Sequence, residues 1–175
     1  MKTAPIPANE KERLASLKEL GMLDTPPEKR FDRMTKLATE IFNVSISTIT
    51  LVDANREWYK SVCGLDATEG ERAIPFCGHA MLADKILIIP DTKKDKRFSD
   101  NPMVTGKPFI RFYAGVPNFS YDGSRIGTFC IKSPKPRQLN AHEIEQLISL
   151  AAWAELEMNS HNSSIRPKDI VKSKK

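Results

Sequence analysis

The stretch SISTITLV, residues 45–52, decides the fold of this chain. It is rich in β-branched residues and roughly alternates polar with apolar side chains, which predicts a strand with one face toward a core. Residues 53–55 (DAN) predict a turn, and residues 57–63 (EWYKSVC) predict the returning strand. Strands joined by a tight turn pair antiparallel, so these segments predict a β-hairpin.

A second hairpin is predicted further along the chain. Residues 111–118 and 125–132 have strand character, and Asp122-Gly123 between them is a strong turn signal. Residues 85–89 (KILII) predict a short apolar strand that ends at Pro90. We therefore expect an antiparallel sheet of several strands.

Helices are predicted at both ends of the chain. Asn9, with Glu12 three residues later, resembles a capping box for a helix that ends near Leu20. Thr25, with Glu28 at the box position, predicts the start of a second helix. Its apolar stripe is expected to face the core and consists of Phe31, Met34, Leu37, Ala38 and Ile41.

The last helix is predicted to begin after Asn140, with Glu143 completing a capping box, and to end near Asn159. Its expected core face consists of Ile144, Leu147, Ile148, Ala151 and Ala154. Helices gathered at the two chain ends cover one face of the intervening sheet, so the predicted fold class is α+β.

The 175 residues suit one domain. We predict a flexible arm over residues 1–8, the folded domain over residues 9–159 and a basic disordered tail over residues 160–175. The segment 166–175 contributes +4 of the net charge of +5, so the folded part is nearly neutral. A nucleic-acid-binding face is therefore not expected.

No run approaches the roughly 18 apolar residues that a membrane-spanning helix needs, and the N-terminus lacks the apolar region of a signal peptide. We predict a cytoplasmic protein. The three cysteines, Cys63, Cys77 and Cys130, are too few and too far apart for a disulfide framework, so buried free thiols are expected.

The chain lacks the phosphate-binding loop, the dinucleotide-binding glycine pattern and the nucleophile elbow of hydrolases. Cys77 and His79 have the chemistry of metal ligands, but no third or fourth ligand is evident, so no metal is predicted. Arg111 lies in an aromatic strand-like run, where it either grips an anion or forms an ion pair with Asp91 or Asp100.

Several short motifs occur in an order that resembles a known family: LDTPP (23–27), LVD (51–53), FCGHA (76–80), IRFYAG (110–115) and IGTFC (126–130). Over residues 9–159 the chain is similar to the bacterial GAF-domain proteins that often precede histidine kinase or diguanylate cyclase modules.

The resemblance implies a five- or six-stranded antiparallel sheet with helices on one face. It also implies a small-molecule pocket on the other face, closed by residues from about 74 to 108. The pocket residues that it implies are Phe76, Cys77, His79, Asp91, Asn101, Arg111 and Tyr113.

Two GAF subclasses do not match. The Asn-Lys and Asp-Glu pairs of cyclic-nucleotide binders are missing, and Ile89-Pro90-Asp91 differs from the Asp-Ile-Pro of bilin binders. The subclass that reduces free methionine sulfoxide with pocket cysteines remains an alternative, because Cys77 adjoins His79 and Cys130 lies on a nearby strand.

We predict a non-catalytic sensory module that binds a small molecule, with no identified cofactor. It would act through a homodimer formed by its terminal helices or through a separate output protein. The alternative is a cysteine-dependent free methionine sulfoxide reductase.

Overall fold

A computed structural model describes residues 1–74 and 76–163, with side chains through Ser160. Its centre is an antiparallel sheet with the strand order β3-β2-β1-β6-β5-β4. The strands are β1 (Ile46–Val52), β2 (Arg56–Cys63), β3 (Glu69–Glu71), β4 (Leu87–Ile89), β5 (Phe112–Phe119) and β6 (Arg125–Ser133).

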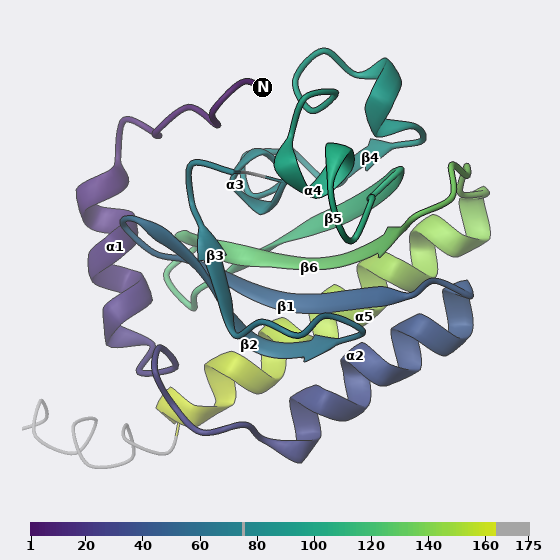
Figure 1. Ribbon diagram of the computed structural model, residues 1–175. Helices are drawn as coiled ribbons and strands as arrows, with labels where there is room; N and C mark the ends of the chain where they lie inside the picture. Colours follow the sequence, from purple (N-terminus) through teal and green to yellow (C-terminus); the bar gives the residue numbers. More distant parts are fainter. Residues whose placement is uncertain (75, 164–175) are drawn as a thin grey trace, which may run out of the picture.

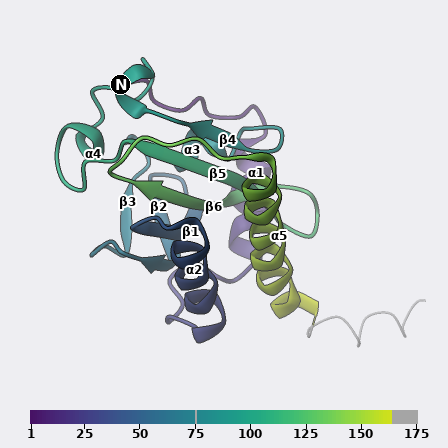
Figure 2. The same ribbon diagram turned by 90° about the vertical axis from the view of Figure 1, so that its right-hand side faces the viewer.

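The helices divide between the two faces of this sheet. α2 (Lys29–Phe42) and α5 (Ala141–Ser163) lie side by side along one face, and α1 (Glu10–Glu19) stands at the end of the sheet (Figures 1 and 2). The opposite face is covered by α3 (Cys77–Ala80) and α4 (Pro102–Thr105), with the 3-10 helix η1 (Thr92–Lys94) between them in the chain. The predicted α+β class is confirmed, and the sheet, expected to have five or six strands, has six.

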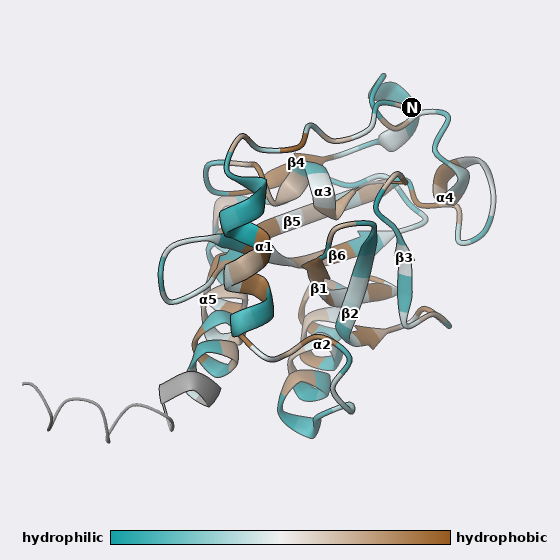
Figure 3. Ribbon diagram, turned by 90° about the vertical axis from the view of Figure 1, so that its left-hand side faces the viewer, coloured by the Kyte–Doolittle hydropathy of each residue, from teal (hydrophilic) through white to brown (hydrophobic). Residues whose placement is uncertain are grey.

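The main core lies between the sheet and the long helices. In β1 and β6, alternate residues Ile49, Leu51, Phe129 and Ile131 point toward α2 and α5 because successive side chains of a strand face opposite ways. They meet apolar residues of the helices, and α1 adds Leu17 and Leu20. In Figure 3 hydrophobic colour lies along the central strands, whereas much of α1 is hydrophilic.

A second, smaller core lies under α3. It consists of Val52, Phe76, Cys77, Ala80, Met81, Ile89, Phe98, Val104, Ile110, Tyr113 and Cys130. The segment from Phe76 to Ile110 is thus attached to the sheet by its own apolar residues.

The predicted caps of the first two helices are wrong. Asn9 precedes α1 but makes no side-chain capping bond. Thr25 does not cap α2, which begins at Lys29, because Pro26 and Pro27 disfavour helix in the residues before them. Thr25 instead donates a hydrogen bond to the Met22 carbonyl at 2.7 Å.

The predicted stripe of α2 is only partly right. Phe31, Met34 and Ala38 are buried, but Leu37 and Ile41 are 38% and 41% exposed. Thr35 and Phe42 take the buried positions instead. The Thr35 hydroxyl has a buried partner, the Ser61 hydroxyl at 2.8 Å, so that face of the helix can turn toward the sheet.

The capping box of α5 is confirmed. The Glu143 backbone N–H donates to the Asn140 side chain, and the Asn140 N–H donates to the Glu143 carboxylate, both at 2.9 Å. Leu147, Ala151 and Ala154 are buried as predicted, whereas Ile144 and Ile148 are half-buried. The helix runs to Ser163, past the predicted end near Asn159.

The hairpin strands lie within two residues of their predicted bounds, but β3 was not predicted. Residues 1–7 have no regular secondary structure, and the Lys2 N–H donates to the Arg97 carbonyl at 3.0 Å. The flexibility of this arm stays a prediction. Within the predicted tail, residues 160–163 belong to α5, and the rest lies outside the described residues.

Candidate functional site

The face of the sheet that α3 covers carries an unusual number of buried polar side chains. Strand alternation places Thr128, Cys130 and Lys132 of β6 on this face, opposite the apolar residues that face α2 and α5. We call the following set the α3-face cluster: Thr48, Thr50, Glu57, Tyr59, Cys77, Tyr113, Thr128, Cys130 and Lys132, all of them buried.

Two free thiols lie at the centre of this cluster. The Sγ atoms of Cys77 and Cys130 are 3.9 Å apart. The Tyr113 hydroxyl donates to Cys77 at 3.5 Å, and the Thr48 hydroxyl lies 2.9 Å from the Cys130 sulfur. The predicted burial of free thiols is confirmed for this pair, whereas Cys63 is half-buried.

The two thiols differ in their readiness to ionise. Burial opposes ionisation of Cys130, but the hydrogen bond from Cys77, the charge of Lys132 and the hydrogen bond from Thr48 outweigh it and lower its pKa to about 6. The hydrogen bond to Cys130 and burial raise the pKa of Cys77 well above its usual range. Cys130 is therefore the thiol with thiolate character.

Two further ionisable groups are buried close to the thiols. Burial raises the pKa of Glu57 well above its usual range, and the carboxylate accepts a hydrogen bond from the Gly78 N–H of α3 at 2.9 Å. Burial disfavours the ammonium of Lys132, but the nearby Cys130 and Cys77 raise its pKa overall. Among the described residues no ion pair joins Glu57 to Lys132, whose Nζ lies 5.7 Å from the centre of the Tyr59 ring.

Aromatic rings attach the covering segment to the sheet. The Phe76 ring stacks between Phe98 and Tyr113, at centroid distances of 4.9 and 5.0 Å. Tyr113 folds over Gly115 on its own strand, where an added Cβ would lie 2.4 Å from the tyrosine oxygen. The structure thus brings together three of the predicted pocket residues, Phe76, Cys77 and Tyr113.

The other predicted pocket residues make their hydrogen bonds outside the α3-face cluster, although the His79 ring lies edge-on to Phe98 at a centroid distance of 5.1 Å. Arg111 forms a two-pronged ion pair with Asp91, with both N–O distances 2.9 Å, so the ion-pair interpretation of Arg111 holds. Asn101 caps α4 by accepting a hydrogen bond from the Met103 N–H at 2.8 Å. His79 is hydrogen-bonded through Nε2 to the Lys2 carbonyl at 2.9 Å.

Nothing in the described part of the chain gathers three or more histidine, cysteine, aspartate or glutamate side chains into a possible metal site. Within the same residues, no helix is long and apolar enough to cross a membrane.

Sequence analysis missed Glu57, Thr128 and Lys132. A signal was available in the sequence, because Thr128, Cys130 and Lys132 alternate with the apolar Phe129 and Ile131. If the apolar residues face the long helices, the polar ones lie on the face that residues 74–108 were expected to cover. Polar residues on the covered face of a central strand are candidates for a functional role.

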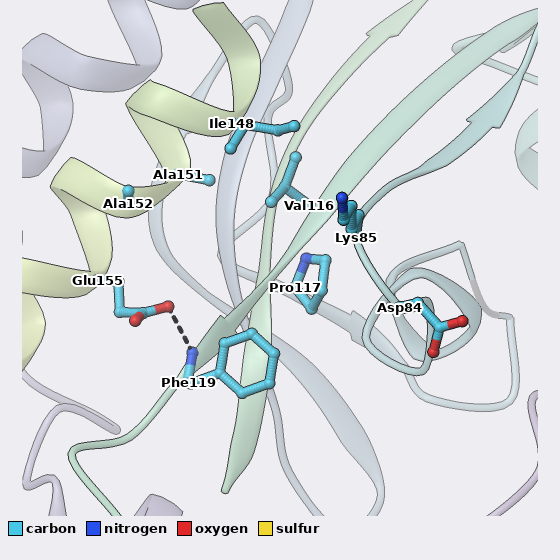
Figure 4. Close-up of a pocket in the computed structure, with 9 residues that line it drawn as sticks. All are labelled: Asp84, Lys85, Val116, Pro117, Phe119, Ile148, Ala151, Ala152 and Glu155. Carbon is cyan, nitrogen blue, oxygen red and sulfur yellow. Dashed lines mark hydrogen bonds between the residues drawn. The ribbon is translucent and has the colours of Figure 1, made fainter. Parts of the chain in front are cut away.

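A separate hollow of about 410 Å³ opens between α5 and β5 (Figure 4). Small and apolar side chains such as Ala151 and Val116 form most of its wall. Glu155, one of two carboxylates in its lining, accepts a hydrogen bond from the Phe119 N–H at 2.9 Å, and burial raises the pKa of Glu155. None of the predicted pocket residues lines this hollow.

Comparison with known proteins adds a sequence relationship. The family model described as GAF domain matches residues 26–158. A cyclic di-GMP phosphodiesterase of Pseudomonas aeruginosa is 36% identical over 137 residues, which is 78% of this chain and 23% of that protein. The chain therefore spans about a quarter of the length of this relative.

Solved structures share the fold at low sequence identity. The GAF domain of an Acinetobacter phosphoenolpyruvate-protein phosphotransferase has a TM-score of 0.63 and 16% identity, and the match covers 88% of this chain and 96% of that one. A type II free methionine-R-sulfoxide reductase from Thermoplasma acidophilum has a TM-score of 0.62 and 18% identity, over 82% and 96% of the two chains.

Proposed function

The chain belongs to the GAF domain family and is a module of the sensory and regulatory kind, and from this premise we propose that it binds a small polar molecule beneath α3. The observation that carries the proposal is the burial of Glu57 and Lys132, which are 4% and 1% exposed. Ionisable groups are rarely retained in an interior unless they are paired or used.

The chemistry of the α3-face cluster suggests the kind of ligand. Among the described residues Lys132 forms no salt bridge with a carboxylate, and the buried Thr128 hydroxyl has no hydrogen-bond partner. Both belong to the same face of β6. A small molecule with acceptor groups toward Lys132 and Thr128 would satisfy both.

Entry of a ligand requires α3 to move, because Phe76 and Tyr113 pack directly against each other. A ligand that binds one position of α3 better than the other would shift the population between the two. This would link ligand binding to the shape of the domain, as sensing requires.

Thermal unfolding over a panel of small carboxylates, phosphates and nucleotides tests the proposal. A ligand at 100 times its Kd stabilises by about 2.7 kcal/mol, which raises the Tm of a domain of this size by about 5 to 10 °C. We expect the same rise in Glu12→Gln, an exposed position of α1 outside the cluster, and a much smaller one in Lys132→Met. A panel without any response, or an undiminished response of folded Lys132→Met, would contradict the proposal.

The proposed output is association through the long helices. Leu37 and Ile41 of α2 are partly exposed, and on α5 Trp153 and Leu156 are 47% and 71% exposed. Clustered exposed apolar residues mark interaction surfaces. We expect sedimentation velocity to show a dimer that Leu156→Asp dissociates; a wild-type chain that stays monomeric at high concentration would rule this route out, leaving a separate output protein.

A binding role does not require catalysis by this chain. The phosphodiesterase name belongs to a relative of which the chain spans 23%, and it says nothing of this segment alone.

The second candidate, a cysteine-dependent reductase of free methionine sulfoxide, is favoured by the 3.9 Å distance between Cys77 and Cys130. Turnover of free methionine sulfoxide with a thiol reductant, abolished in Cys77→Ser, would support it.

A further inference from the structure

The distance between Cys77 and Cys130 is short enough for the two sulfurs to react with each other. Their Sγ atoms are 3.9 Å apart, and a disulfide bond is about 2.05 Å long. Cys77 begins the four-residue helix α3, whereas Cys130 lies in β6, which is paired on both sides with β1 and β5. A movement of about 2 Å by the short helix closes the gap.

The surroundings give the two sulfurs different roles. Cys130 shares its face of β6 with the buried ammonium of Lys132 two residues later, and the Thr48 hydroxyl lies 2.9 Å from its sulfur. These groups stabilise a thiolate, which is the reactive form of cysteine. Besides Cys130, the hydrogen-bond partners of Cys77 are the hydroxyls of Tyr113 and Thr50, at 3.5 and 3.6 Å.

We propose that Cys77 and Cys130 form a reversible intramolecular disulfide on reaction with hydrogen peroxide. This inference stands on the geometry of the two thiols and does not depend on the small-molecule ligand proposed above.

The reaction proceeds in two balanced steps. The Cys130 thiolate attacks one oxygen of the peroxide, the O–O bond breaks, and a sulfenic acid forms while the departing hydroxide takes up a proton to become water. The sulfur of Cys77 then attacks the Cys130 sulfur, the S–S bond forms and the S–O bond breaks. The second hydroxide leaves as water with the proton of the Cys77 thiol, and a dithiol reductant restores both thiols.

Hydrogen peroxide is the oxidant class that suits this site, because both thiols are 0% exposed and the molecule is nearly as small as water. Bond formation also alters the cover of the site. Next to Cys77, the Gly78 N–H donates to buried Glu57, and Phe76 stacks on Tyr113. Pulling Cys77 toward β6 disturbs both contacts, so we expect faster amide exchange in α3 after oxidation.

The test uses the full chain, reduced and then exposed to hydrogen peroxide, with free thiols alkylated under denaturing conditions before intact-mass analysis. We expect a loss of two hydrogen masses, one alkylated cysteine (Cys63), and a peptide pair joined through Cys77 and Cys130. Cys63→Ser is the matched control and should form the same bond. A disulfide that includes Cys63, or no disulfide under conditions that oxidise free cysteine, overturns the proposal.

Single substitutions check the order of the steps. In Cys77→Ser the sulfenic acid of Cys130 has no resolving thiol, so dimedone present while the oxidised protein is unfolded in urea should label Cys130. In Cys130→Ser neither a disulfide nor dimedone labelling of Cys77 is expected. Dimedone labelling of Cys77 in Cys130→Ser refutes the assigned roles, and so does the absence of labelling of Cys130 in folded Cys77→Ser. The wild-type alkylation pattern tests the disulfide itself even if a variant fails to fold.

Discussion

The replacement Glu10→Gln tests how α1 is fixed to the sheet. The Glu10 carboxylate accepts hydrogen bonds from Arg13 at 2.7 and 2.8 Å and from Arg72 at 2.5 Å. Arg13 is 1% exposed, and Arg72 also donates to the Asp53 carbonyl at 3.1 Å. Glutamine keeps the shape of the side chain but removes the charge that faces the two guanidinium groups.

The size of the effect follows from the ionisation of Glu10. Burial opposes its ionisation, but the hydrogen bonds from Arg13 and Arg72 outweigh burial and lower its pKa from 4.5 to about 2. That difference corresponds to at most about 3.4 kcal/mol of stability at neutral pH. The side chain is 16% exposed, so screening by solvent reduces the expected loss to about 2 kcal/mol.

The stabilisation that Glu10 contributes depends on pH. A carboxylate with a lowered pKa stabilises the fold above pH 4.5, and this contribution is lost as the pH falls toward 2. Urea unfolding should therefore show the full loss for Glu10→Gln at pH 7 and less than half of it at pH 3.

Glu12→Gln is the control, because Glu12 is an exposed acid in the same first turn. We expect it to change the free energy of unfolding by no more than about 0.5 kcal/mol. An equal loss for Glu10→Gln at both pH values, or an equal loss for Glu12→Gln, would refute the assigned role of the ion pairs.

Two further predictions concern the sheet and the surface. Gly127→Ala should lower the free energy of unfolding in urea by more than about 3 kcal/mol or prevent folding, because the added Cβ would lie 1.9 Å from a carbonyl oxygen of β1. Gly123→Ala is the comparison, since Gly123 has a φ of +84° but no atom lies within 4 Å of an added Cβ. This substitution should lower the free energy of unfolding by only about 1 to 2 kcal/mol. Equal losses for the two variants would contradict the proposed clash at Gly127. Arg111→Gln should lower the free energy of unfolding by no more than about 1 kcal/mol, because its ion pair with Asp91 is only partly buried, with side chains 29% and 12% exposed; a larger drop would mean that the pair supports the covering segment.

The sequence was sufficient to predict every strand of the sheet except β3, because each of the others carries its own pattern. Alternation and the Asp122-Gly123 turn predicted the hairpins, and the reciprocal hydrogen bonds of Asn140 and Glu143 confirmed the start of α5. The predicted start of α2 is wrong because proline disfavours helix in the residue before it, although proline itself suits the first helical turn. β3, with the sequence Glu-Gly-Glu, has no strand pattern and exists because it pairs with β2.

The candidate site was harder to predict, because it depends on contacts between distant segments. Cys77 and Cys130 are 53 residues apart in the chain, and their distance follows only from where α3 lies over β6. Arg111 shows the converse difficulty: a charged residue in an aromatic strand-like run suits an anion site, yet Asp91 pairs with it 20 residues away. Local pattern indicates which face a side chain takes but not which distant partner it meets there.

One residue joins the cover of the site to the N-terminal helix. The guanidinium group of Arg125 donates to the carbonyls of Met81 and Ala83, just after α3, at 2.7 and 2.6 Å. Its own carbonyl accepts a hydrogen bond from Arg13 of α1 at 3.3 Å. Any displacement of α3 that moves Met81 must therefore break these hydrogen bonds or transmit force to the start of β6, where α1 is attached. Both the proposed ligand and the proposed disulfide act on α3, so this connection gives either event a physical route to a terminal helix.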